Sequence, residues 1–424
     1  MYLEKKSTMS DDPDQKEAVE CAKSGKNFFL TGAGGTGKTY VIHAIQETLR
    51  TLGKDVKVTA MTGCASLLLG NRASTLHSWA GIGLGKEPLD SLLQKIRKSR
   101  ARKNWLCVDS LIIDEISMML PELLEKLDAI GRTLRKKQEP FGGIQVILVG
   151  DFFQLPPVSS SIMFLFESKL WKQEFTTCIT LRKIHRQKDA IFQKILLEAR
   201  AGILSKESID ILETRKVPPN FFKKKGTLEI LPTLLFTRRE DVETVNTNYL
   251  KKCEGEDVIY EAETEGFGVQ EELVEKMDKQ SPYLPRLVLR KGAQVMMLIN
   301  KYSEHGIVNG SRGVVESFDP LENKPLVKFR NGTVLSISRF TWESDGVKRN
   351  QIPLRLAYAI TIHKSQGATL DYALIEIGSN TFEYGQAYVA LSRVKSLESL
   401  FIWDLDPSAF RVHPKVLEFS TSQT

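Results

Sequence analysis

Short apolar runs recur along this chain, and most are followed by a stretch in which apolar residues have helical spacing. The runs are too short for buried helices and resemble strands covered on both faces of a parallel sheet. They comprise residues 27–30, 56–61, 110–113, 144–149, 177–181, 232–236, 356–362 and 374–377. Alternating strands and helices of this kind predict an α/β fold.

A different pattern occupies residues 286–342, where short apolar segments are separated by turn sequences. The dipeptides Asn309-Gly310 and Asn331-Gly332 are strong hairpin signals. This stretch is therefore predicted to be a small barrel inserted into a second α/β domain. Residues 254–279, by contrast, are acidic and have no clear period, which predicts a linker or a solvated excursion.

Residues 32–39 fit the phosphate-loop pattern G-x-x-x-x-G-K-[ST] at every fixed position, between a predicted strand and a predicted helix. Backbone N–H groups of such a loop converge on phosphates, and the helix N-terminus adds positive charge. The residues expected to bind nucleotide phosphates are Gly32, Gly34, Gly35, Thr36, Gly37, Lys38 and Thr39. Among them, Lys38 is expected to neutralise phosphate charge and the Thr39 hydroxyl to hold Mg²⁺.

Polar residues follow two of the other predicted strands. Asp114 and Glu115 end one apolar run, where they would face the ligand crevice of a parallel sheet. Asp114 can hold Mg²⁺, and Glu115 can orient and deprotonate an attacking water. Gln154 follows another run and is placed to sense the γ-phosphate, while Phe152 beside it offers a base a stacking face.

Several residues are open to both a functional and a structural interpretation. Gln15 could read an adenine edge or be a surface glutamine. His77, close to Trp79, could contact a sugar-phosphate backbone or be a packed histidine. The basic span 86–105 could be a solvated surface or an exposed insertion near a polynucleotide.

Basic residues also follow the later apolar runs. His363 and Lys364 end one predicted strand, where a lysine beside hydroxyl groups suits phosphate contacts. Arg186 and Arg393 both lie in the stretch expected to form the second α/β domain. Two arginines facing a nucleotide on the first domain would stabilise the charge of a transferring phosphate.

Composition limits the class of protein. The 424 residues suffice for two or three domains, and a net charge of +7 is compatible with nucleic acid without requiring it. The five cysteines have no metal-ligand spacing and predict reduced thiols in an intracellular protein. No apolar run reaches membrane-spanning length, and residues 1–6 lack the apolar core of a signal peptide.

Taken in order, these motifs resemble those of the Pif1 family of DNA helicases, in the 5′-to-3′ branch of superfamily 1. The most diagnostic stretch joins residues 127–129, 140–145 and 150–157. Further motifs in the family's order are residues 75–78, 181–187, 308–313, 363–367 and 388–393. The resemblance extends from Gln15 to about Trp403, and one departure is Gly34-Gly35, where many relatives have Ala-Gly.

The resemblance implies two RecA-like P-loop NTPase domains, with a small SH3-like β insertion in the second and a small wedge insertion in the first. The expected limits are residues 1–175 for the first domain, with the wedge at about 80–105, and residues 176–253 and 346–424 for the second. Residues 254–285 would be the linker or excursion and residues 286–345 the SH3-like insertion.

The implied activity is that of an ATP-dependent DNA helicase, which hydrolyses ATP, moves 5′-to-3′ on single-stranded DNA and unwinds duplex DNA. Its implied roles are in DNA replication, repair or recombination and in genome maintenance, with ATP and Mg²⁺ as cofactors. The implied catalytic residues are Lys38, Glu115, Gln154, Arg186 and Arg393, with Gln15 on adenine and Thr39 and Asp114 on Mg²⁺. The residues implied or expected to contact DNA are Thr62, His77, Phe152, His363 and Lys364.

The expected partners are single-stranded DNA and tailed or forked duplex DNA, with G-quadruplexes and RNA–DNA hybrids as further candidates and no membrane. The core form is expected to be a monomer in the nucleus, the mitochondrion, or the cytoplasm of a bacterium or virus-infected cell. Three alternatives stay open: a translocase that does not unwind duplex, a nucleotide-gated DNA-binding protein without turnover, and a nucleotide kinase or small GTPase.

Overall fold

A computed structural model of the protein divides into two compact units. The first comprises Met1–Lys188 and Val412–Thr424, and the second comprises Asp189–Arg411. The structure describes residues 11–70, 73–83, 85–157, 162–218, 230–266, 269–299, 301–344, 347–378 and 380–423. Residues 1–6, on which the expected lack of a signal peptide rests, lie outside this described part.

A six-stranded parallel sheet forms the centre of the first unit, in the order β3-β2-β4-β5-β1-β6. Its strands are β1 (Phe28–Gly32), β2 (Val56–Ala60), β3 (Ser74–Thr75), β4 (Ser110–Asp114), β5 (Gln145–Gly150) and β6 (Cys178–Leu181). In β1, β4 and β5 successive apolar side chains point to opposite faces, so each strand contributes to two cores. The continuous apolar runs in the sequence are explained by this double burial.

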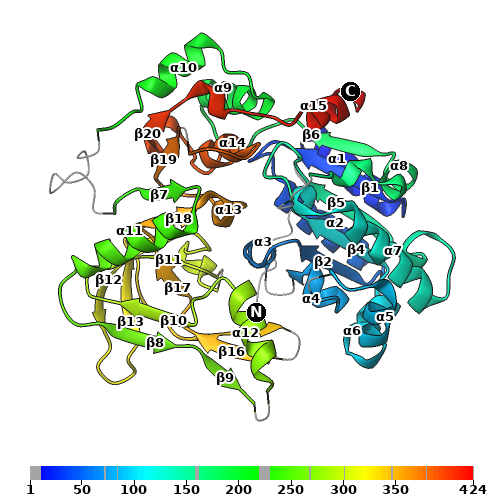
Figure 1. The fold of residues 1–424 in the computed structure, drawn as a ribbon, viewed down its shortest axis with the longest axis horizontal. Coiled ribbons are helices and arrows are strands. Elements are labelled where there is room, and N and C mark those ends of the chain that lie inside the picture. The colour runs from blue at the N-terminus through cyan, green and yellow to red at the C-terminus, as the bar shows by residue number, and fades with distance from the viewer. Residues whose placement is uncertain are drawn as a thin grey trace. The chain divides into compact units, whose positions relative to one another are not determined.

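Helices cover both faces of this sheet (Figure 1). They are α1 (Pro13–Lys23), α2 (Lys38–Thr51), α3 (Gly63–Leu68), α4 (Leu76–Ala80), α5 (Leu89–Lys98), α6 (Ala101–Cys107), α7 (Pro121–Arg135), α8 (Lys169–Glu174) and α15 (Pro414–Ser422). Helices α1, α2 and α3 share one core with the strands, and α4 to α8 share the other with α15. This arrangement leaves the carboxyl ends of the strands as the edge at which polar residues gather.

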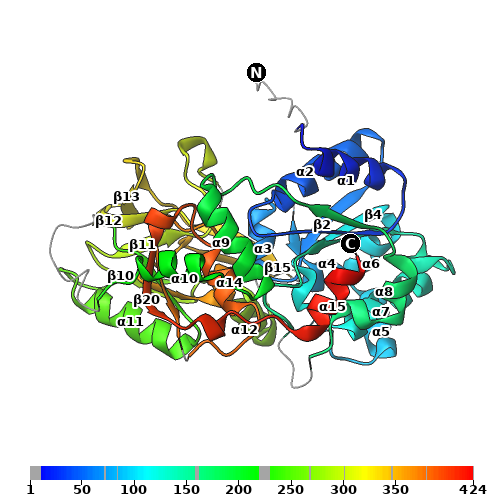
Figure 2. The same ribbon diagram turned by 90° about the horizontal axis from the view of Figure 1, so that it is seen from above.

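The limits expected for the first domain need two corrections. Strand β6 pairs with β1 in parallel, with Leu30 opposite Ile179, so the unit continues past residue 175 to Lys188. The C-terminal helix α15 also returns to this unit (Figure 2). There Phe419 stacks on Phe166 with ring centroids 4.3 Å apart. Both corrections concern pairings between residues far apart in the chain, which a local pattern does not reveal.

The basic span 86–105 is helical and packed on one side. Helices α5 and α6 bury Leu92, Ile96 and Trp105, and the Trp105 indole donates a hydrogen bond to the carbonyl of Ala80 at 3.0 Å. The basic side chains at positions 95, 97, 98, 100, 102 and 103 are exposed. The span therefore combines a structural core with a solvated basic face.

A four-stranded parallel sheet in the order β18-β7-β19-β20 forms the centre of the second unit. Its strands are β7 (Thr233–Phe236), β18 (Ala359–Thr361), β19 (Ala373–Ile377) and β20 (Leu400–Leu405). The helices of the unit are α9 (Ala190–Ala201), α10 (Lys206–Glu213), α11 (Arg239–Lys251), α12 (Glu271–Gln280), α13 (Ile362–Ser365) and α14 (Gln386–Leu391). All six residues of α14 are buried.

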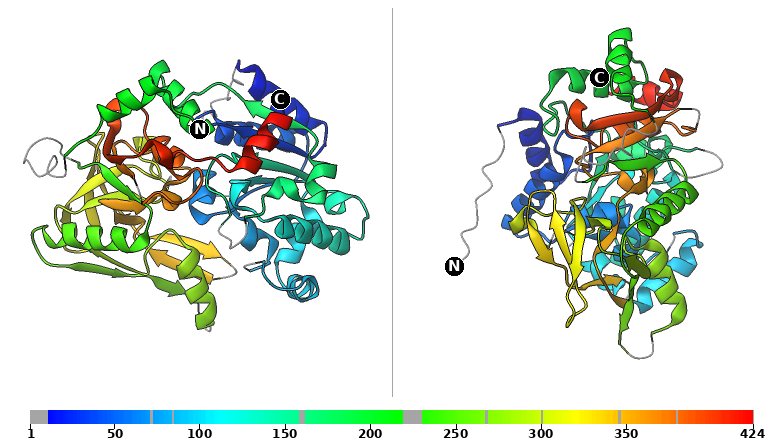
Figure 3. Two further views of the ribbon diagram at one scale, coloured as in Figure 1. Left: turned by 45° about the horizontal axis from the view of Figure 1, so that its top comes forward. Right: turned by 90° about the vertical axis from the view of Figure 1, so that its left-hand side faces the viewer.

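A β-rich insertion lies between α11 and β18 in the chain. Its strands are the arrows coloured yellow-green to orange in Figure 3. It contains a five-stranded antiparallel sheet in the order β14-β13-β12-β11-β17, a β8-β10 pair and a three-stranded β15-β16-β9 sheet. Its strands are β8 (Val258–Glu261), β9 (Glu263–Glu265), β10 (Arg286–Leu289), β11 (Gln294–Met297), β12 (Arg312–Phe318), β13 (Pro325–Phe329), β14 (Val334–Ser336), β15 (Phe340–Ser344), β16 (Val347–Gln351) and β17 (Leu354–Leu356). The expected β insertion is present, but it extends beyond residue 345 to β17.

The interpretation of residues 254–285 as a linker or excursion is wrong. Strands β8 and β9 lie in this stretch and pair with β10 and β16, so the stretch belongs to the insertion. Only Tyr260 among the residues of these two strands is buried. Strand β9 is Glu-Thr-Glu, and β8 has only three consecutive apolar residues, so neither strand has the alternation of apolar and polar residues by which a half-buried strand is recognised.

Candidate active site

The phosphate loop connects β1 to α2, as its sequence predicts. Gly37 immediately precedes α2 with φ 88°, and Gly35 has φ 91°, so both adopt the left-handed conformation that glycine tolerates. A Cβ atom at Gly35 would lie 2.7 Å from Gln187 Oε1 and 2.8 Å from the Cβ atom of Arg186, which is fixed by its backbone. Glycine is therefore required at position 35 by the close approach of another segment as well as by its backbone conformation.

Side chains of the loop are held by its own backbone. Thr36 is 1% exposed, and its hydroxyl donates to the carbonyl of Ala33 at 2.9 Å. Lys38 Nζ donates to the carbonyl of Gly32 at 2.6 Å and to that of Ala33 at 3.2 Å. Thr39 is exposed in the first turn of α2. The lysine ammonium group thus lies over the loop, where the backbone carbonyls can release it to an anionic phosphate.

Asp114 and Glu115 lie at the carboxyl end of β4, where both are buried. Asp114 Oδ1 accepts a hydrogen bond from the Glu115 N–H at 2.8 Å. Burial, and then the negative charge of Glu115, raise the pKa of Asp114 to about 7, while the Glu115 N–H and the Lys38 ammonium oppose this shift. The predicted metal ligand and the predicted phosphate-binding lysine therefore belong to one site.

Glu115 has φ 57°, in the left-handed region that a residue with a Cβ adopts only at a cost in free energy. Such strained residues are common at functional sites, where the surrounding structure holds them.

Within the described ranges no cluster of three or more His, Cys, Asp or Glu side chains could bind a metal ion. The buried carboxylate of Asp114, whose charge a neighbouring cation would stabilise, fits Mg²⁺, which is usually held by one or two carboxylates together with substrate phosphates.

The raised pKa of Asp114 predicts a pH-dependent stability. A protonated Asp114 favours the folded state, and this contribution is complete below the ordinary pKa of 3.8 and is lost as the pH rises through about 7. Asp114→Asn, which removes the charge and preserves the shape, should raise the Tm of the nucleotide-free protein by a few degrees at alkaline pH and much less at acidic pH. Calorimetry without Mg²⁺ at about pH 5 and about pH 8 would test this, and equal changes at both pH values would contradict it.

Gln154 lies in the turn after β5 and is 5% exposed. Its N–H donates to the carbonyl of Asp151 at 3.0 Å, which makes the turn tight. Because β5 lies between β4 and β1 in the sheet, the turn is at the same edge as Asp114 and the phosphate loop. The structure thus brings the predicted γ-phosphate sensor to the expected edge.

Gln15 is buried at 4% exposure, so the alternative of a surface glutamine is wrong. Its Nε2 lies 3.3 Å from His185 Nε2, which in turn lies 3.1 Å from Asp12 Oδ2. Gln15 Oε1 is buried without a hydrogen-bond partner among the described residues. Gln15 Nε2 is 3.1 Å from the position that a Cβ on Gly37 would occupy, so the amide lies beside the phosphate loop.

The segment after β6 lies on the phosphate loop, because the N–H groups of His185 and Arg186 both donate to the carbonyl of Gly35. Arg186 was expected in the second domain, and this expectation is wrong, since residues up to Lys188 belong to the first unit. His185 and Gln187 were not among the predicted site residues. Their position beside Arg186 in one short motif could have identified them as site residues from the sequence.

Arg393 lies in the second unit just after α14 and is 2% exposed. Its guanidinium donates to the carbonyls of Val389, Ser365 and Ala368 at 2.8, 3.1 and 3.3 Å. These bonds join α14 to the segment that follows His363 and Lys364. Arg393 therefore has a structural role within its own unit, in addition to the catalytic role predicted for it.

The other residues predicted to contact DNA lie in both units. Thr62 accepts a hydrogen bond from the Ala65 N–H at 3.2 Å at the start of α3, and His77 is half-buried in α4. His363 Nε2 lies 2.9 Å from Glu383 Oε2, and Lys364 is exposed. Contact of these four residues with DNA stays a prediction.

Phe152 does not offer a face to a base. Its side chain is 5% exposed, and its ring contacts those of Phe29, Phe166, Trp171 and Phe419 at centroid distances of 5.0–5.6 Å. The prediction of a stacking role is wrong because the turn after β5 directs this ring into the core. A phenylalanine in a functional motif does not show on which side of the backbone its ring lies.

The burial of Phe152 gives an expected result. Phe152→Ala should lower the free energy of unfolding by about 3–5 kcal/mol and leave the affinity of the folded protein for single-stranded DNA unchanged. Denaturant titration and fluorescence anisotropy would measure the two quantities. A large loss of affinity without a loss of stability would restore the stacking role.

Two general expectations can also be compared with the structure. Cys21, Cys107, Cys178 and Cys253 are free thiols, and the side chain of the fifth cysteine, Cys64, lies outside the described part of the structure. Within the part of the chain that is described, every helix is too short or too polar to cross a lipid bilayer.

Comparison with known proteins identifies the family. A model described as PIF1-like helicase matches residues 12–207, and one described as DNA helicase Pif1, 2B domain, matches residues 272–318. The crystal structure of Pif1 helicase from Candida albicans is 35% identical with a TM-score of 0.82, covering 97% of this chain and 99% of that one. The chain belongs to the Pif1 helicase family.

Other Pif1 proteins extend this likeness. The ATP-dependent DNA helicase PIF1 of Danio rerio is 40% identical over 96% of this chain and 63% of its own length. This chain therefore spans less than two thirds of that Pif1 relative. Bacteroides Pif1 bound to single-stranded DNA is 30% identical with a TM-score of 0.68, covering 97% of this chain and 96% of that one.

The predicted family and fold class are confirmed. The two parallel-sheet units correspond to the two RecA-like domains of Pif1 structures, with insertions. The match to the Pif1 2B domain begins at residue 272, inside the stretch expected to be a linker. This agrees with the pairing of β8 and β9 within the insertion.

Proposed function

We propose that this chain is an ATP-dependent DNA helicase that translocates 5′-to-3′ on single-stranded DNA and unwinds duplex DNA. The observation that carries the proposal is the meeting of Lys38, Asp114, Glu115 and Gln154 at one sheet edge, in a chain of the Pif1 family. ATP hydrolysis requires a phosphate cradle, a metal ligand and a group that orients water, and these residue types supply all three.

In the proposed site, Gln15 reads the adenine edge. Its unpartnered Oε1 can accept a hydrogen bond from an adenine amino group, while the Nε2 donates to a ring nitrogen. A buried amide oxygen without a partner is costly, so a donor from a ligand at this position would stabilise the site. The proximity of Gln15 to Gly37 supports a base held beside the phosphates.

At the phosphate end, residues 32–39 wrap the phosphates, and Lys38 leaves the loop carbonyls to neutralise phosphate charge. Thr39 and Asp114 would hold Mg²⁺, which supplies further charge neutralisation at the phosphate oxygens. Glu115 orients the attacking water and accepts its proton. Gln154 hydrogen-bonds to the γ-phosphate, and Arg186 stabilises the charge that develops during transfer.

Arg393 is proposed as the second arginine of the reaction, on the strength of its sequence motif. Its hydrogen bonds to the Ser365 and Ala368 carbonyls support a second proposed role, as a link to the segment that contacts DNA. They tie Arg393 to the segment of His363 and Lys364, which we propose to contact DNA. A change in one of these segments can thereby affect the other.

The proposed DNA path is lined by Thr62, His77, His363 and Lys364, and the exposed basic face of α5 and α6 is proposed as a wedge at the fork. Contacts to stacked bases and backbone phosphates carry no base specificity. We infer single-stranded DNA and tailed or forked duplexes as partners, because Bacteroides Pif1 binds single-stranded DNA. G-quadruplexes and RNA–DNA hybrids are further proposed substrates of an intracellular, monomeric enzyme acting in replication, repair or recombination.

ATP-driven unwinding of two matched duplexes tests this function, one with a 5′ single-stranded tail and one with a 3′ tail. Unwinding from the 5′ tail alone is the expected result. Unwinding from the 3′ tail alone would contradict the polarity. DNA-stimulated ATP hydrolysis without unwinding would instead indicate a translocase, and DNA binding without ATP hydrolysis would indicate a nucleotide-gated binding protein.

A further inference from the structure

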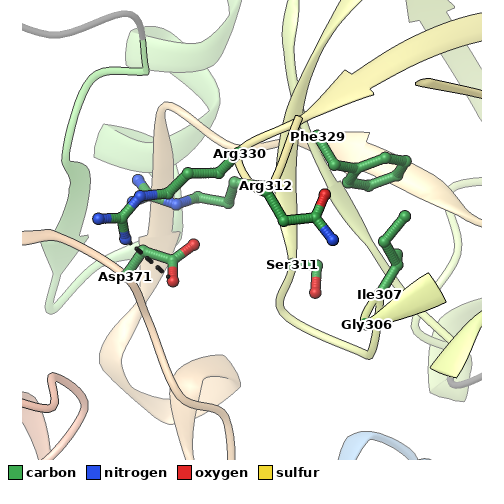
Figure 4. A pocket seen from close by; sticks show the side chains of 8 residues that line it. Gly306, Ile307, Ser311, Arg312, Phe329, Arg330 and Asp371 are labelled. Carbon is green, nitrogen blue, oxygen red and sulfur yellow. Dashed lines mark ion pairs between the residues drawn. The ribbon is translucent and has the colours of Figure 1, made fainter. Parts of the chain in front are cut away.

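The second unit contains a pocket of about 270 Å³ between the β-rich insertion and the loop that precedes β19. Ser311, Arg312, Arg330, Asn331 and Asp371 contribute polar side chains to its lining (Figure 4). Its volume is below the roughly 300–1,000 Å³ of pockets for drug-sized molecules. The pocket therefore suits a small polar group.

Arg312 is the unusual residue of this pocket, because it is a buried cation whose hydrogen-bonding groups are only partly satisfied. Its side chain comes from β12 and is 1% exposed. Nη1 donates to the carbonyl of Leu231 at 2.8 Å and to the hydroxyl of Thr233 at 3.0 Å. Nε and Nη2 are buried without a hydrogen-bond partner in the described residues.

The charge of Arg312 is also poorly compensated. Burial lowers the pKa of its guanidinium to about 10, although the carboxylate of Asp371 opposes this shift. No ion pair joins Arg312 to a carboxylate in the described stretches of the chain. A buried charge without a close counter-ion is costly, so an anion at this position would be favourable.

Arg330 supplies a second cation at the rim, where its side chain is 41% exposed. Its Nη1 lies 3.1 Å from Asp371 Oδ1, and its Nη2 donates to the Tyr372 hydroxyl at 2.9 Å. The guanidinium carbons of Arg330 and Arg312 lie 4.2 and 6.0 Å from the centroid of the Tyr372 ring. Figure 4 shows both arginine side chains extending to the region of Asp371.

We propose that this pocket binds one phosphoryl oxyanion, supplied by a phosphodiester of single-stranded nucleic acid or by free phosphate. Two guanidinium groups and one carboxylate leave one uncompensated positive charge in the lining, which matches the single negative charge of a phosphodiester. Guanidinium groups bind such oxyanions through paired N–H donors. The nucleic-acid source rests on the proposed function, whereas the free-phosphate source does not.

Binding requires a small rearrangement at the rim. Nε and Nη2 of Arg312 are closed to solvent, so side chains that line the pocket must shift for an oxyanion to approach them. The Arg330 side chain is 41% exposed, so its guanidinium is accessible at the rim and can donate to the same oxyanion. Both arginines then share the ligand, and Asp371 keeps the net charge of the pocket low.

Thermal unfolding of the full chain in sodium phosphate, against sodium chloride of equal ionic strength, tests the pocket. Arg330→Gln removes one cation of the pocket, and Arg312→Lys keeps the charge but removes the paired donors. The matched control is Arg286→Gln, which removes an exposed charge of the same insertion, 62% exposed and paired with Glu261. The phosphate loop contributes equally in every protein, so differences among them report the pocket.

The rise in Tm with phosphate should fall by at least half in Arg330→Gln and Arg312→Lys and stay at the wild-type value in Arg286→Gln. Salt titrations of oligothymidine binding provide the second arm. If a backbone phosphate occupies the pocket, the slope of log affinity against log salt should drop by about 0.7 in Arg330→Gln and stay unchanged in Arg286→Gln.

The two arms separate the sources of the oxyanion. Effects in both arms support a nucleic-acid phosphodiester, and an effect in the thermal arm alone supports free phosphate. No difference between Arg330→Gln and Arg286→Gln in either arm would mean that the pocket holds only water, and would overturn the proposal. Failure of the wild-type protein to bind the oligonucleotide would count against the proposed function. The thermal unfolding experiments would still decide whether the pocket binds an oxyanion.

Discussion

Replacing Lys38 by alanine should lower ATP hydrolysis by at least about 10³-fold. The Lys38 ammonium lies over the phosphate loop, where it donates to the carbonyls of Gly32 and Ala33. In the proposed reaction it moves to the phosphates, and alanine leaves their negative charge uncompensated. Steady-state hydrolysis with and without single-stranded DNA measures this effect.

The matched control is Lys26→Ala, which removes an exposed lysine just before β1, at the end of that strand opposite the phosphate loop. This variant should hydrolyse ATP at the wild-type rate. Lys38→Ala should still bind single-stranded DNA, because the residues proposed to line the DNA path lie elsewhere. DNA-stimulated hydrolysis that persisted in Lys38→Ala would contradict the assignment of the phosphate loop.

The parts of the site that could be predicted from the sequence are those encoded in contiguous residues. The loop 32–39 needs glycines at fixed positions because of its backbone conformation, so the sequence alone identifies it as a phosphate loop. Asp114 and Glu115 could be placed because a buried apolar strand must end at the sheet edge. The α/β fold class followed from the same apolar runs.

The parts that could not be predicted depend on contacts between distant residues. The return of α15 to the first unit depends on Phe419 packing on Phe166, and no local pattern near either residue indicates the other. Strands β8 and β9 are stabilised by pairing with β10 and β16 while their side chains stay mostly exposed. The inward direction of the Phe152 ring is likewise set by the tertiary packing of five aromatic rings.

The raised pKa of Asp114 and the unpartnered amide oxygen of Gln15 likewise could not be predicted from the sequence. Each depends on burial, which the sequence indicates only on average. The sequence identified both residues by their positions in motifs, but it left open whether Gln15 was exposed. The structure resolves that choice, since Gln15 is 4% exposed beside His185.

Arg186→Ala should lower kcat for ATP by about 10³-fold or more, as the loss of an arginine finger does in other phosphoryl-transfer enzymes. The KM for ATP should change far less, because the arginine acts on charge that develops during transfer. Arg182→Ala is the matched control. Its side chain is 76% exposed and pairs with Asp14, so its loss removes the same charge from the same segment.

Arg393→Ala should combine a catalytic loss with a structural one, in contrast to Arg186→Ala. Alanine at position 393 leaves the carbonyls of Val389, Ser365 and Ala368 without this donor, so the Tm should fall. Turnover per folded molecule, corrected by the denaturation curve, separates the two losses. A corrected rate equal to that of the wild type would confine Arg393 to its structural role. Arg186 and Lys38 would then supply the positive charge that stabilises the transferring phosphate.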